Sequence, residues 1–424
     1  MGRTLSETNA DLAIIGAGAA GLMTAIAAAP RLRDARVLLL DGAKRVGVKI
    51  LVAGGGRCNV THHAVDEQQY AGGSRNTIRN VLRRFSADDT VAFFSELGVE
   101  LKREKTGKLF PTTDDAHTVL DALLLEVDRL GVVLWHPWRV AAIARCSNGF
   151  EIIRDTGEAM SARRVVVCTG GKALPRSGSD GGGYTLVQSL GHTLTDRVFP
   201  SLVPLRTSPG SSWITELSGL SCRAAVEVRA STGKKLARFE NDLLCTHFGL
   251  SGPAPMDASR WLTAARLADA DASLHVAWLP NASFEEADAQ LRELGKKQVA
   301  TWLRERLPER LAHALCTQTG IDPVTPGTGL AKDDRRALAH TLTGMKIDIA
   351  GDRGFTHAET TAGGVPLTEI DPKTMKSRAC DGLFLAGEIL DVDGRIGGFN
   401  FQWAWATGHI AGIAAAESLG KLAE

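Results

Sequence analysis

The stretch Asp11-Leu-Ala-Ile-Ile-Gly-Ala-Gly-Ala-Ala-Gly21 decides the fold of this chain. It opens on a short apolar run, typical of a buried parallel strand, and leads into Ala19–Ala29, which is rich in the strongest helix former. Between them stands the pattern G-x-G-x-x-G. Gly16 allows the tight turn, Gly18 lets the backbone approach a pyrophosphate, and Gly21 lets the helix pack on the strand. The positive end of the helix would face the phosphates.

An acidic residue stands where a dinucleotide site needs one. Arg36–Leu40 is a second apolar strand, and Asp41 closes it at position 20 after Gly21. A carboxylate here accepts hydrogen bonds from ribose hydroxyls and repels a 2′-phosphate. Strand, glycine turn, helix and acid together predict a Rossmann-type dinucleotide-binding domain, whereas a glycine turn without a ligand is the alternative.

The segments after the second strand favour FAD over NAD, because an NAD domain usually continues with further strand–helix units. Here Gly47–Thr61 reads as an extended segment and a glycine loop, and helices are predicted over 86–98 and 116–130. A β-meander over 132–168 precedes the strand and Thr-Gly-Gly turn of Val165–Gly171. That turn resembles the second cofactor-contacting turn of glutathione-reductase-like flavoproteins, and Gly382–Glu388 resembles their ribitol-binding strand.

The rest of the chain predicts an insertion into this α/β fold. Alternating strands begin near Phe199, and a capping box at Ser283 starts a helical stretch that runs to about Cys316. Pro323–Gly329 looks like a surface linker. We therefore expect a first part of the FAD-binding domain over 1–198, an inserted β-barrel and helical subdomain over 199–345, and the second part of the FAD-binding domain over 346–424.

Longer motifs carry a closer resemblance. They are Gly47-Val-Lys-Ile-Leu-Val-Ala-Gly-Gly-Gly-Arg-Cys-Asn59, Thr246-His-Phe-Gly-Leu-Ser-Gly-Pro253, Gly387-Glu-Ile-Leu-Asp-Val-Asp-Gly394, Gly397-Gly-Phe-Asn400 and Gln402-Trp-Ala-Trp405. With them the chain resembles the BaiN/RdsA-like NAD(P)/FAD-dependent oxidoreductases of bacteria over nearly its whole length. Two departures are Val48, where that family usually has Arg, and Asp41, where Glu is commoner. The resemblance implies reduction of carbon–carbon double bonds, in one branch of bile-acid-type enoyl substrates and in another of uridine in large-subunit ribosomal RNA.

The cofactor-binding set follows from the glycine turns, the acidic residue and the family motifs. Amides at the start of the last helix would face the part of the flavin where negative charge builds on reduction. The residues expected to bind FAD are Gly16, Ala17, Gly18, Ala19, Ala20, Gly21, Asp41, Lys49, Gly55, Gly56, Arg57, Cys58, Asn59, Val140, Thr169, Gly170, Gly171, Gly387, Glu388, Gly397, Gly398, Phe399 and Asn400.

Two side chains are candidates for proton transfer. Cys58 adjoins the glycine loop, and its thiol could protonate one carbon while a hydride reaches its neighbour; the alternative is a small buried packing residue. His247 lies among turn residues in the insertion and could act in the same way, although such a histidine often only satisfies a loop. Trp403 and Trp405 could cover the flavin, but we expect them in the core, as we do Cys168.

Composition bounds the remaining possibilities. No second G-x-G-x-x-G follows a strand, so NADH or NADPH would dock transiently, or a protein would supply the electrons. The seven cysteines show no C-x-x-C spacing, which argues against a zinc ribbon or a redox disulfide, and no metal site is expected. With no long apolar run and no signal-peptide pattern, we expect a cytoplasmic protein without a membrane partner.

The substrate stays open between two classes. The net charge is +1, so there is no global electrostatic case for nucleic acid, although Arg75, Arg79, Arg83 and Arg84 concentrate positive charge near the glycine loop. No aromatic residues interleave with these arginines to stack bases. We favour a small unsaturated molecule over ribosomal RNA, and a structural FAD without turnover is the third alternative.

Overall fold

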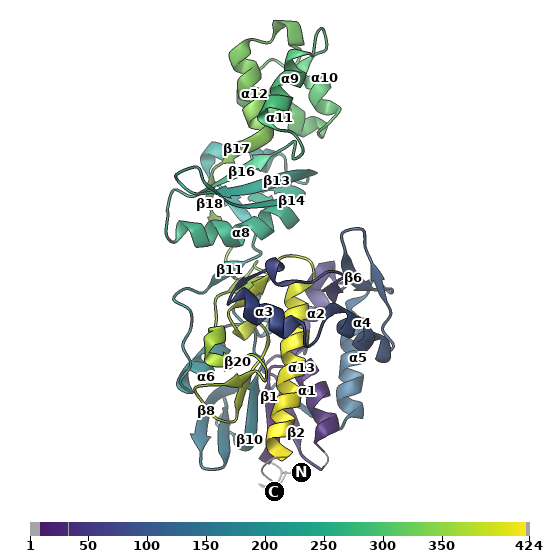
Figure 1. The fold of residues 1–424 in the computed structure, drawn as a ribbon, viewed down its shortest axis with the longest axis vertical. Helices are drawn as coiled ribbons and strands as arrows, with labels where there is room; N and C mark the ends of the chain where they lie inside the picture. The colour runs from purple at the N-terminus through teal and green to yellow at the C-terminus, as the bar shows by residue number, and fades with distance from the viewer. Residues whose placement is uncertain (1–8, 33, 421–424) are drawn as a thin grey trace. The chain divides into compact units, whose positions relative to one another are not determined.

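The computed structural model describes residues 9–32 and 34–420, and it forms two compact units (Figure 1). The first unit combines the chain up to Pro200 with the segment from Glu359 onward, and the second is Ser201–Ala358. Each has its own hydrophobic core. The α/β fold class with an insertion is confirmed. The insertion extends to Ala358 rather than ending at Met345, because two further strands complete its sheet.

A parallel sheet forms the centre of the first unit. Its strands lie in the order β22-β10-β1-β2-β7, with bounds β22 Leu383–Leu385, β10 Ala159–Val167, β1 Asn9–Ile15, β2 Val37–Leu40 and β7 Val133–Trp135. The antiparallel strands β20 Ile370–Asp371 and β21 Lys376–Ser377 extend one edge, and the predicted meander consists of β8 Val140–Cys146, β9 Gly149–Arg154 and β10. The carboxyl ends of β1, β2, β10 and β22 therefore meet at one edge, where ligands bind in such sheets.

Two long helices pack side by side on this sheet, α1 Ala19–Ala28 and α13 Phe399–Gly420 (Figure 1). Their backbones approach closely because small residues line the contact. A Cβ on Gly408 would lie 2.5 Å from the carbonyl oxygen of Ala20, and one on Gly412 would overlap the carbonyl oxygen of Thr24. The start of α13 is thereby fixed relative to the glycine turn that precedes α1.

Shorter elements complete the first unit. Its other helices are α2 Val48–Val52, α3 Arg75–Leu82, α4 Ala87–Glu96, α5 Ala116–Arg129 and α6 Gly182–Ser189. Its other strands are β3 Thr61–His62, β4 Tyr70–Gly72, β5 Leu101–Arg103, β6 Lys108–Pro111, β19 Thr360–Ala362 and β23 Val392–Gly394, while β11 Phe199–Ser201 leads into the second unit. The helices predicted over 86–98 and 116–130 are confirmed as α4 and α5, with Ser86 and Asp115 as their caps.

Two predictions of local structure were wrong. The stretch after Gly47 is not extended but forms α2, because Gly47 adopts φ +67° and turns the chain into the helix Val48–Val52. Pro323–Gly329 is not a linker. The amide of Val299 donates to the carbonyl of Thr325, and that of Gly327 donates to the carbonyl of Lys297, so the segment is built into the second unit.

The second unit contains a seven-stranded sheet in the order β17-β16-β13-β14-β15-β12-β18. The bounds are β12 Leu205–Thr207, β13 Ser221–Arg229, β14 Lys235–Thr246, β15 Gly249–Ser251, β16 Ser273–Ala277, β17 Met345–Ile347 and β18 Ile349–Asp352. Its edge strands β17 and β18 are separated only by residue 348, so the sheet curls round on itself as the predicted barrel requires.

Helices cover the rest of this unit: α7 Trp213–Glu216, α8 Pro253–Arg266, α9 Phe284–Arg292, α10 Val299–Arg304, α11 Glu309–Thr319 and α12 Lys332–Gly344. The capping box at Ser283 is confirmed, since its side chain accepts from the amide of Glu286 at the start of α9. Among the described helices, none is long and apolar enough to cross a membrane.

Candidate cofactor site

The three glycines of the first turn have the three environments that a pyrophosphate site requires. Gly16 adopts φ +101°, and a Cβ there would lie 2.5 Å from the carbonyl oxygen of Cys168 at the end of β10. A Cβ on Gly21 would overlap the carbonyl oxygen of Gly16, so α1 and β1 touch. Around a Cβ on Gly18, in contrast, no described atom lies within 4 Å. The turn is therefore closely packed at Gly16 and Gly21 and open at Gly18, where the phosphates would approach.

Asp41 ties the end of β2 to the same turn. Its Oδ2 accepts a hydrogen bond from the amide of Ala17 at 2.7 Å, and its Oδ1 accepts one from the amide of Ala43 at 2.7 Å. Burial raises the pKa of this carboxyl above its ordinary value, and the two backbone hydrogen bonds oppose that shift. Each carboxylate oxygen has a further lone pair, so Asp41 retains acceptor capacity for a ribose hydroxyl.

The turn after β10 contains a polar group that has no partner. The hydroxyl of Thr169 is buried and makes no hydrogen bond with any residue that the structure describes. An unsatisfied buried hydroxyl is destabilising by about 1–3 kcal/mol, so such groups usually face a ligand or a water. Gly170 adopts φ +72°, and Gly171 is packed against the side chains of Thr361 and Glu388.

Lys49 and Glu388 form an ion pair between α2 and the end of β22. The Lys49 Nζ lies 2.7 Å from Glu388 Oε2, and it also donates to the Ser179 hydroxyl at 3.2 Å. The second carboxylate oxygen, Oε1, accepts from the backbone amide of Thr361 at 2.9 Å. The hydrogen bonds of Glu388 therefore join three segments that lie far apart in the sequence, and about a fifth of its side chain remains exposed.

The segment Thr360–Gly364 also belongs to this cluster, although the sequence did not predict it. The Thr361 hydroxyl accepts from the amides of Lys172 and Ala173 at 2.8 and 3.0 Å. The Thr360 hydroxyl is buried without a partner in the described chain, like that of Thr169. The sequence signal for this segment was the glycine pair at 363–364, which follows two threonines. The structure shows why glycine stands there, since Gly363 and Gly364 adopt φ +88° and +156°.

The turn Gly397–Gly398 before α13 is hydrogen-bonded to the segment that follows the glycine loop. With its amide oriented to satisfy both partners, Asn59 accepts from the amide of Gly398 at 2.9 Å and donates to the carbonyl of Thr61 at 3.0 Å. A Cβ on Gly398 would lie 2.7 Å from that carbonyl oxygen. The ring of His62, also missed from the sequence, stacks on Phe399 with a centroid distance of 5.0 Å.

Asn400 and the tryptophans fix the helix itself. Asn400 accepts from the amide of Gly394 and donates to its carbonyl, at 2.8 and 3.0 Å. Trp403 and Trp405 are buried, and their indole N–H groups donate to the carbonyls of Gly387 and Val60. The core role predicted for both tryptophans is confirmed.

The glycine loop is open, but its arginine is engaged elsewhere. Gly54, Gly55 and Gly56 all adopt positive φ, and no described atom lies within 4 Å of a Cβ on Gly55. The Arg57 guanidinium is 2.7 Å from Glu104 and lies over the ring of Phe110 at 4.0 Å. Val140, in contrast, is a buried residue at the start of β8.

Cys58 and His247 lie in different environments. Cys58 is fully buried with φ +59°, and burial raises the pKa of its thiol to about 12. His247 belongs to the second unit, where it is exposed in the turn between β14 and β15 with its ring edge-on to Phe248 at 5.0 Å. Every residue expected to bind FAD lies in the first unit, and of the two catalytic candidates only Cys58 does.

Comparison with known proteins identifies the family. Residues 10–414 match the model of the HI0933-like protein Rossmann domain. The chain belongs to the HI0933-like family. It is 36% identical over 411 residues to a 3-dehydro-bile acid delta(4,6)-reductase of Clostridium scindens, covering 96% of this chain and 99% of the relative. It is 32% identical over 404 residues to a ribosomal RNA dihydrouridine synthase of Escherichia coli, covering 94% and 96%.

Solved structures share the fold at low sequence identity. Escherichia coli quinol fumarate reductase FrdA matches 98% of this chain and 71% of its own, with a TM-score of 0.52 and 18% identity. A 3-ketosteroid delta1-dehydrogenase from Sterolibacterium denitrificans matches 97% and 100%, with a TM-score of 0.50 and 13% identity. The chain is an FAD-dependent oxidoreductase of the HI0933-like family. The open turn at Gly18 and the unpartnered Thr169 hydroxyl fit that cofactor.

Proposed function

We propose that this protein reduces a carbon–carbon double bond of a small unsaturated molecule. The observation that carries the proposal is the full-length similarity to a 3-dehydro-bile acid delta(4,6)-reductase. The named activities of both curated relatives amount to saturation of a double bond conjugated to a carbonyl group, and we extend that reaction class to this chain. Reduced FAD, when bound, supplies the hydride for such a bond.

The residues of the first unit have separate roles in this proposal. The open turn at Gly18 and the N-terminus of α1 hold the pyrophosphate, and Asp41 accepts a ribose hydroxyl. Lys49 orients the Glu388 carboxylate, whose remaining lone pairs would accept from the ribitol hydroxyls of bound FAD. The start of α13, held by Asn59, presents its positive end to the flavin ring, where negative charge develops.

Cys58 and His247 remain the proposed proton donors. A thiol with a pKa of about 12 stays protonated across the physiological range, so Cys58 can donate a proton but does not serve as a base at rest. His247 is exposed to solvent in the turn between β14 and β15. The variants Cys58→Ala and His247→Ala distinguish the two candidates. Replacing the residue that donates the proton should lower kcat without changing the FAD content, whereas replacing the other residue should leave kcat unchanged.

The electron source and location are also part of the proposal. NADH or NADPH docks transiently, or a protein donor supplies the electrons, because the described chain has one dinucleotide turn of this kind. All seven cysteines are free, which supports a reducing cytoplasm.

Anaerobic reoxidation tests the reaction class. The FAD-loaded protein is photoreduced, mixed with a series of cyclic α,β-unsaturated ketones and followed at the flavin absorbance maximum. Reoxidation with formation of the saturated ketone is expected. If no member of the series reoxidises the flavin but oxygen does, the small-molecule proposal fails. A flavin that cannot be reduced at all would indicate a structural cofactor.

Uridine in large-subunit ribosomal RNA is the second candidate substrate. The observation favouring it is the group of arginines at 75, 79, 83 and 84, together with the 32% identity to a ribosomal RNA dihydrouridine synthase. Deleting the gene and measuring dihydrouridine in ribosomal RNA tests it. Loss of a dihydrouridine that the intact gene restores, and a Gly18→Val copy does not, would replace the small molecule with RNA.

A further inference from the structure

Helix α3 has one buried apolar face and one exposed face without acidic residues. Ile78, Val81 and Leu82 are buried. The exposed positions of the helix and its ends are Ser74, Arg75, Asn76, Asn80, Arg83 and Arg84. Arginine together with small amide and hydroxyl side chains is the combination that proteins use to contact phosphate and sugar groups.

Three of the four arginines are free to bind a ligand. The side chains of Arg75, Arg83 and Arg84 form no hydrogen bond or ion pair with any residue described in the structure. Arg79 is the exception, because it pairs with Glu67, which holds the pKa of that carboxyl at about 2. Arg83 reinforces this shift by its charge alone. Unpaired guanidinium groups on one helix repel one another, and a polyanion would relieve that repulsion.

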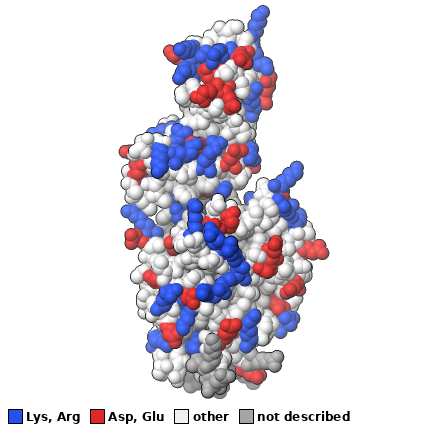
Figure 2. All heavy atoms as spheres, viewed as in Figure 1, with Lys and Arg blue, Asp and Glu red and all other residues white. Residues whose placement is uncertain are grey.

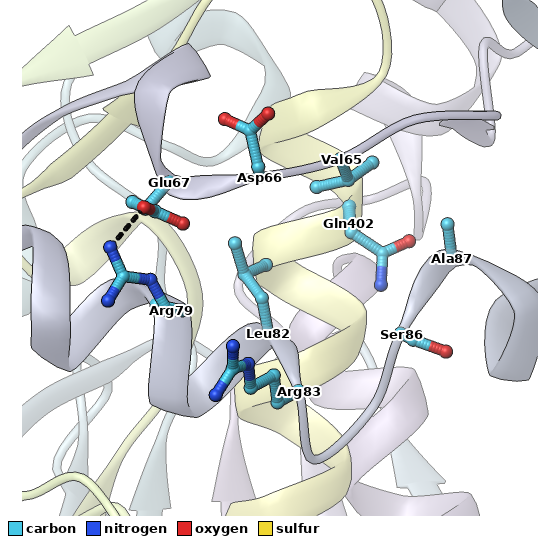
Figure 3. Close-up of a pocket in the computed structure, with 9 residues that line it drawn as sticks. All are labelled: Val65, Asp66, Glu67, Arg79, Leu82, Arg83, Ser86, Ala87 and Gln402. Atoms are coloured by element: carbon cyan, nitrogen blue, oxygen red, sulfur yellow. Dashed lines mark hydrogen bonds and ion pairs between the residues drawn. The ribbon is translucent and has the colours of Figure 1, made fainter.

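The spacing of these charges suits a chain of phosphates better than a single one. Arg75, Arg79 and Arg83 recur every four residues, so their Cα atoms follow one face at a rise of about 6 Å per step. Figure 2 shows Lys and Arg gathered in a continuous stripe over α3. A pocket of about 240 Å³ opens beside this stripe (Figure 3). Its lining includes the cations Arg79 and Arg83 and also the carboxylates Asp66 and Glu67, of which Glu67 pairs with Arg79.

The fold of the first unit brings the arginines of α3 close to the candidate cofactor site. The pocket is also lined by Gln402 of α13, the second residue after Asn400. Strand β4, which precedes α3, pairs with β23, and β23 leads to the Gly397–Gly398 turn. A polyanion lying on α3 is thus bound near the end of α13 that is proposed to face the flavin.

We propose that α3 with Arg83 and Arg84 is a docking surface for the sugar–phosphate backbone of RNA. The inference rests on the second substrate class proposed above, and it adds the surface that would hold that substrate. Charge complementarity selects the partner, because the exposed, unpaired Arg75, Arg83 and Arg84 with flanking amides match successive phosphates. The absence of aromatic residues on the described helix predicts contact with backbone rather than stacking of bases.

Salt-dependent binding of a labelled RNA hairpin to the FAD-loaded protein tests the surface. The triple variant Arg75→Gln, Arg83→Gln, Arg84→Gln removes exposed, unpaired groups, so FAD content and the thermal midpoint should stay as in the parent. Its affinity should fall at least about 30-fold, and the slope of log Kd against log salt should drop by ~2, because each phosphate contact contributes ~0.7–0.9.

A matched control separates this site from a general charge effect. Lys105, Lys234 and Lys332 are also exposed and have no ion-pair partner among the described residues. Changing all three to Gln removes the same net charge and should alter affinity less than about threefold. Equal losses in both triple variants, or no binding by the parent at physiological salt, would overturn the proposal. The assay needs no turnover, so its result is independent of whether the flavin reduces a double bond.

Discussion

At the scale of single residues, Gly18 and Gly21 give opposite predictions although both belong to one motif. A Cβ on Gly18 meets no described atom within 4 Å, whereas one on Gly21 overlaps the Gly16 carbonyl oxygen. Gly18→Val should therefore fold but bind FAD more weakly by roughly 1–3 kcal/mol, about fivefold to 150-fold. The ratio of flavin to protein absorbance after dialysis, and the urea midpoint of the apoprotein, measure the two effects.

Gly21→Ala is the contrasting variant. It should lower the urea midpoint of the apoprotein itself, because α1 must move away from β1 to make room for the methyl group. If Gly18→Val unfolds the apoprotein as strongly as Gly21→Ala does, the turn is structural and not a phosphate cradle.

The sequence predicted residues whose role depends on local spacing, and it missed those whose partners are distant. The roles of Gly16, Gly18 and Gly21 follow from a six-residue pattern. The Lys49–Glu388 pair joins residues 339 positions apart, and no local pattern encodes it. Arg57 was predicted as a cation near the cofactor, but the fold also brings Glu104 next to it, which spacing along the chain does not reveal.

At the scale of elements, the buried His192, in the loop after α6, forms hydrogen bonds with the edge hairpin β20–β21 and with Glu369 just before it. The Ser377 hydroxyl accepts from the amides of Ala379 and Cys380, so its own hydrogen is donated to His192 Nε2 at 2.8 Å. This assigns the imidazole proton to Nδ1, which donates to Glu369 at 2.7 Å. Ser377→Ala removes the partner of two buried groups, His192 Nε2 and the amide of Cys380, and should lower stability by about 2–3 kcal/mol.

Urea unfolding of this variant beside Ser147→Ala gives the comparison. Ser147 is exposed, and its loss should change stability by no more than about 0.5 kcal/mol. The Nδ1–H assignment predicts a slowly exchanging imidazole proton in the NMR spectrum. Equal stability of the two variants would show that the Ser377 hydrogen bonds are replaced by water.

In the second unit, the strands β13 and β14 share a buried carboxylate that makes stability depend on pH. Burial raises the pKa of Glu227, but hydrogen bonds from Lys235, Arg229 and Arg238 outweigh it and hold the value at about 2. Because this pKa lies below the ordinary value of a free glutamate, the stabilisation is present above about pH 4.5 and is lost as the pH falls toward 2.

Glu227→Gln should remove this dependence. It leaves three cations without their anion and should lower stability at pH 7 by about 2 kcal/mol, less than the ~3–5 kcal/mol of a fully buried pair, since the cations are one-third to one-half exposed. Urea midpoints at pH 7 and pH 3 measure it. An unchanged difference between the two pH values would contradict the assignment.

Elements were predictable from sequence where a cap or a period marked them. Ser86 and Ser283 correctly predicted the starts of α4 and α9. Each side-chain oxygen accepts a hydrogen bond from the backbone amide three residues later, which is a pattern that the local sequence reveals. The helix α2 was missed because a five-residue stretch with four apolar residues is equally compatible with a strand, and only the positive φ of Gly47 decides between them. The order of the strands in the barrel-like sheet was not predictable, since it depends on pairing across an interval of more than a hundred residues.

At the scale of the whole molecule, the two units have separate cores, so we expect each unit to have its own stability. The apolar residues of the first core lie between Ala10 and Leu419 outside the insertion, and those of the second lie between Leu205 and Ile349. The sequence indicated this division through the alternating strands that begin near Phe199. It did not indicate where the second boundary falls, because β17 and β18 belong by pairing to the inserted sheet.

Because all the residues expected to bind FAD belong to the first unit, the cofactor should stabilise one unit and not the other. At free FAD a hundred times its Kd, linkage adds about 2.7 kcal/mol to the unit that binds it. For a unit of this size that corresponds to a rise of roughly 5–10 °C in Tm. Scanning calorimetry of the apoprotein and the FAD-loaded protein should show two transitions, of which only one moves. Leu342→Ala, which opens a cavity in the second core, should lower the other transition and leave the FAD-dependent one in place. A single transition that shifts as a whole with FAD would mean that the units unfold together, and the separate cores would then not be independent folding units.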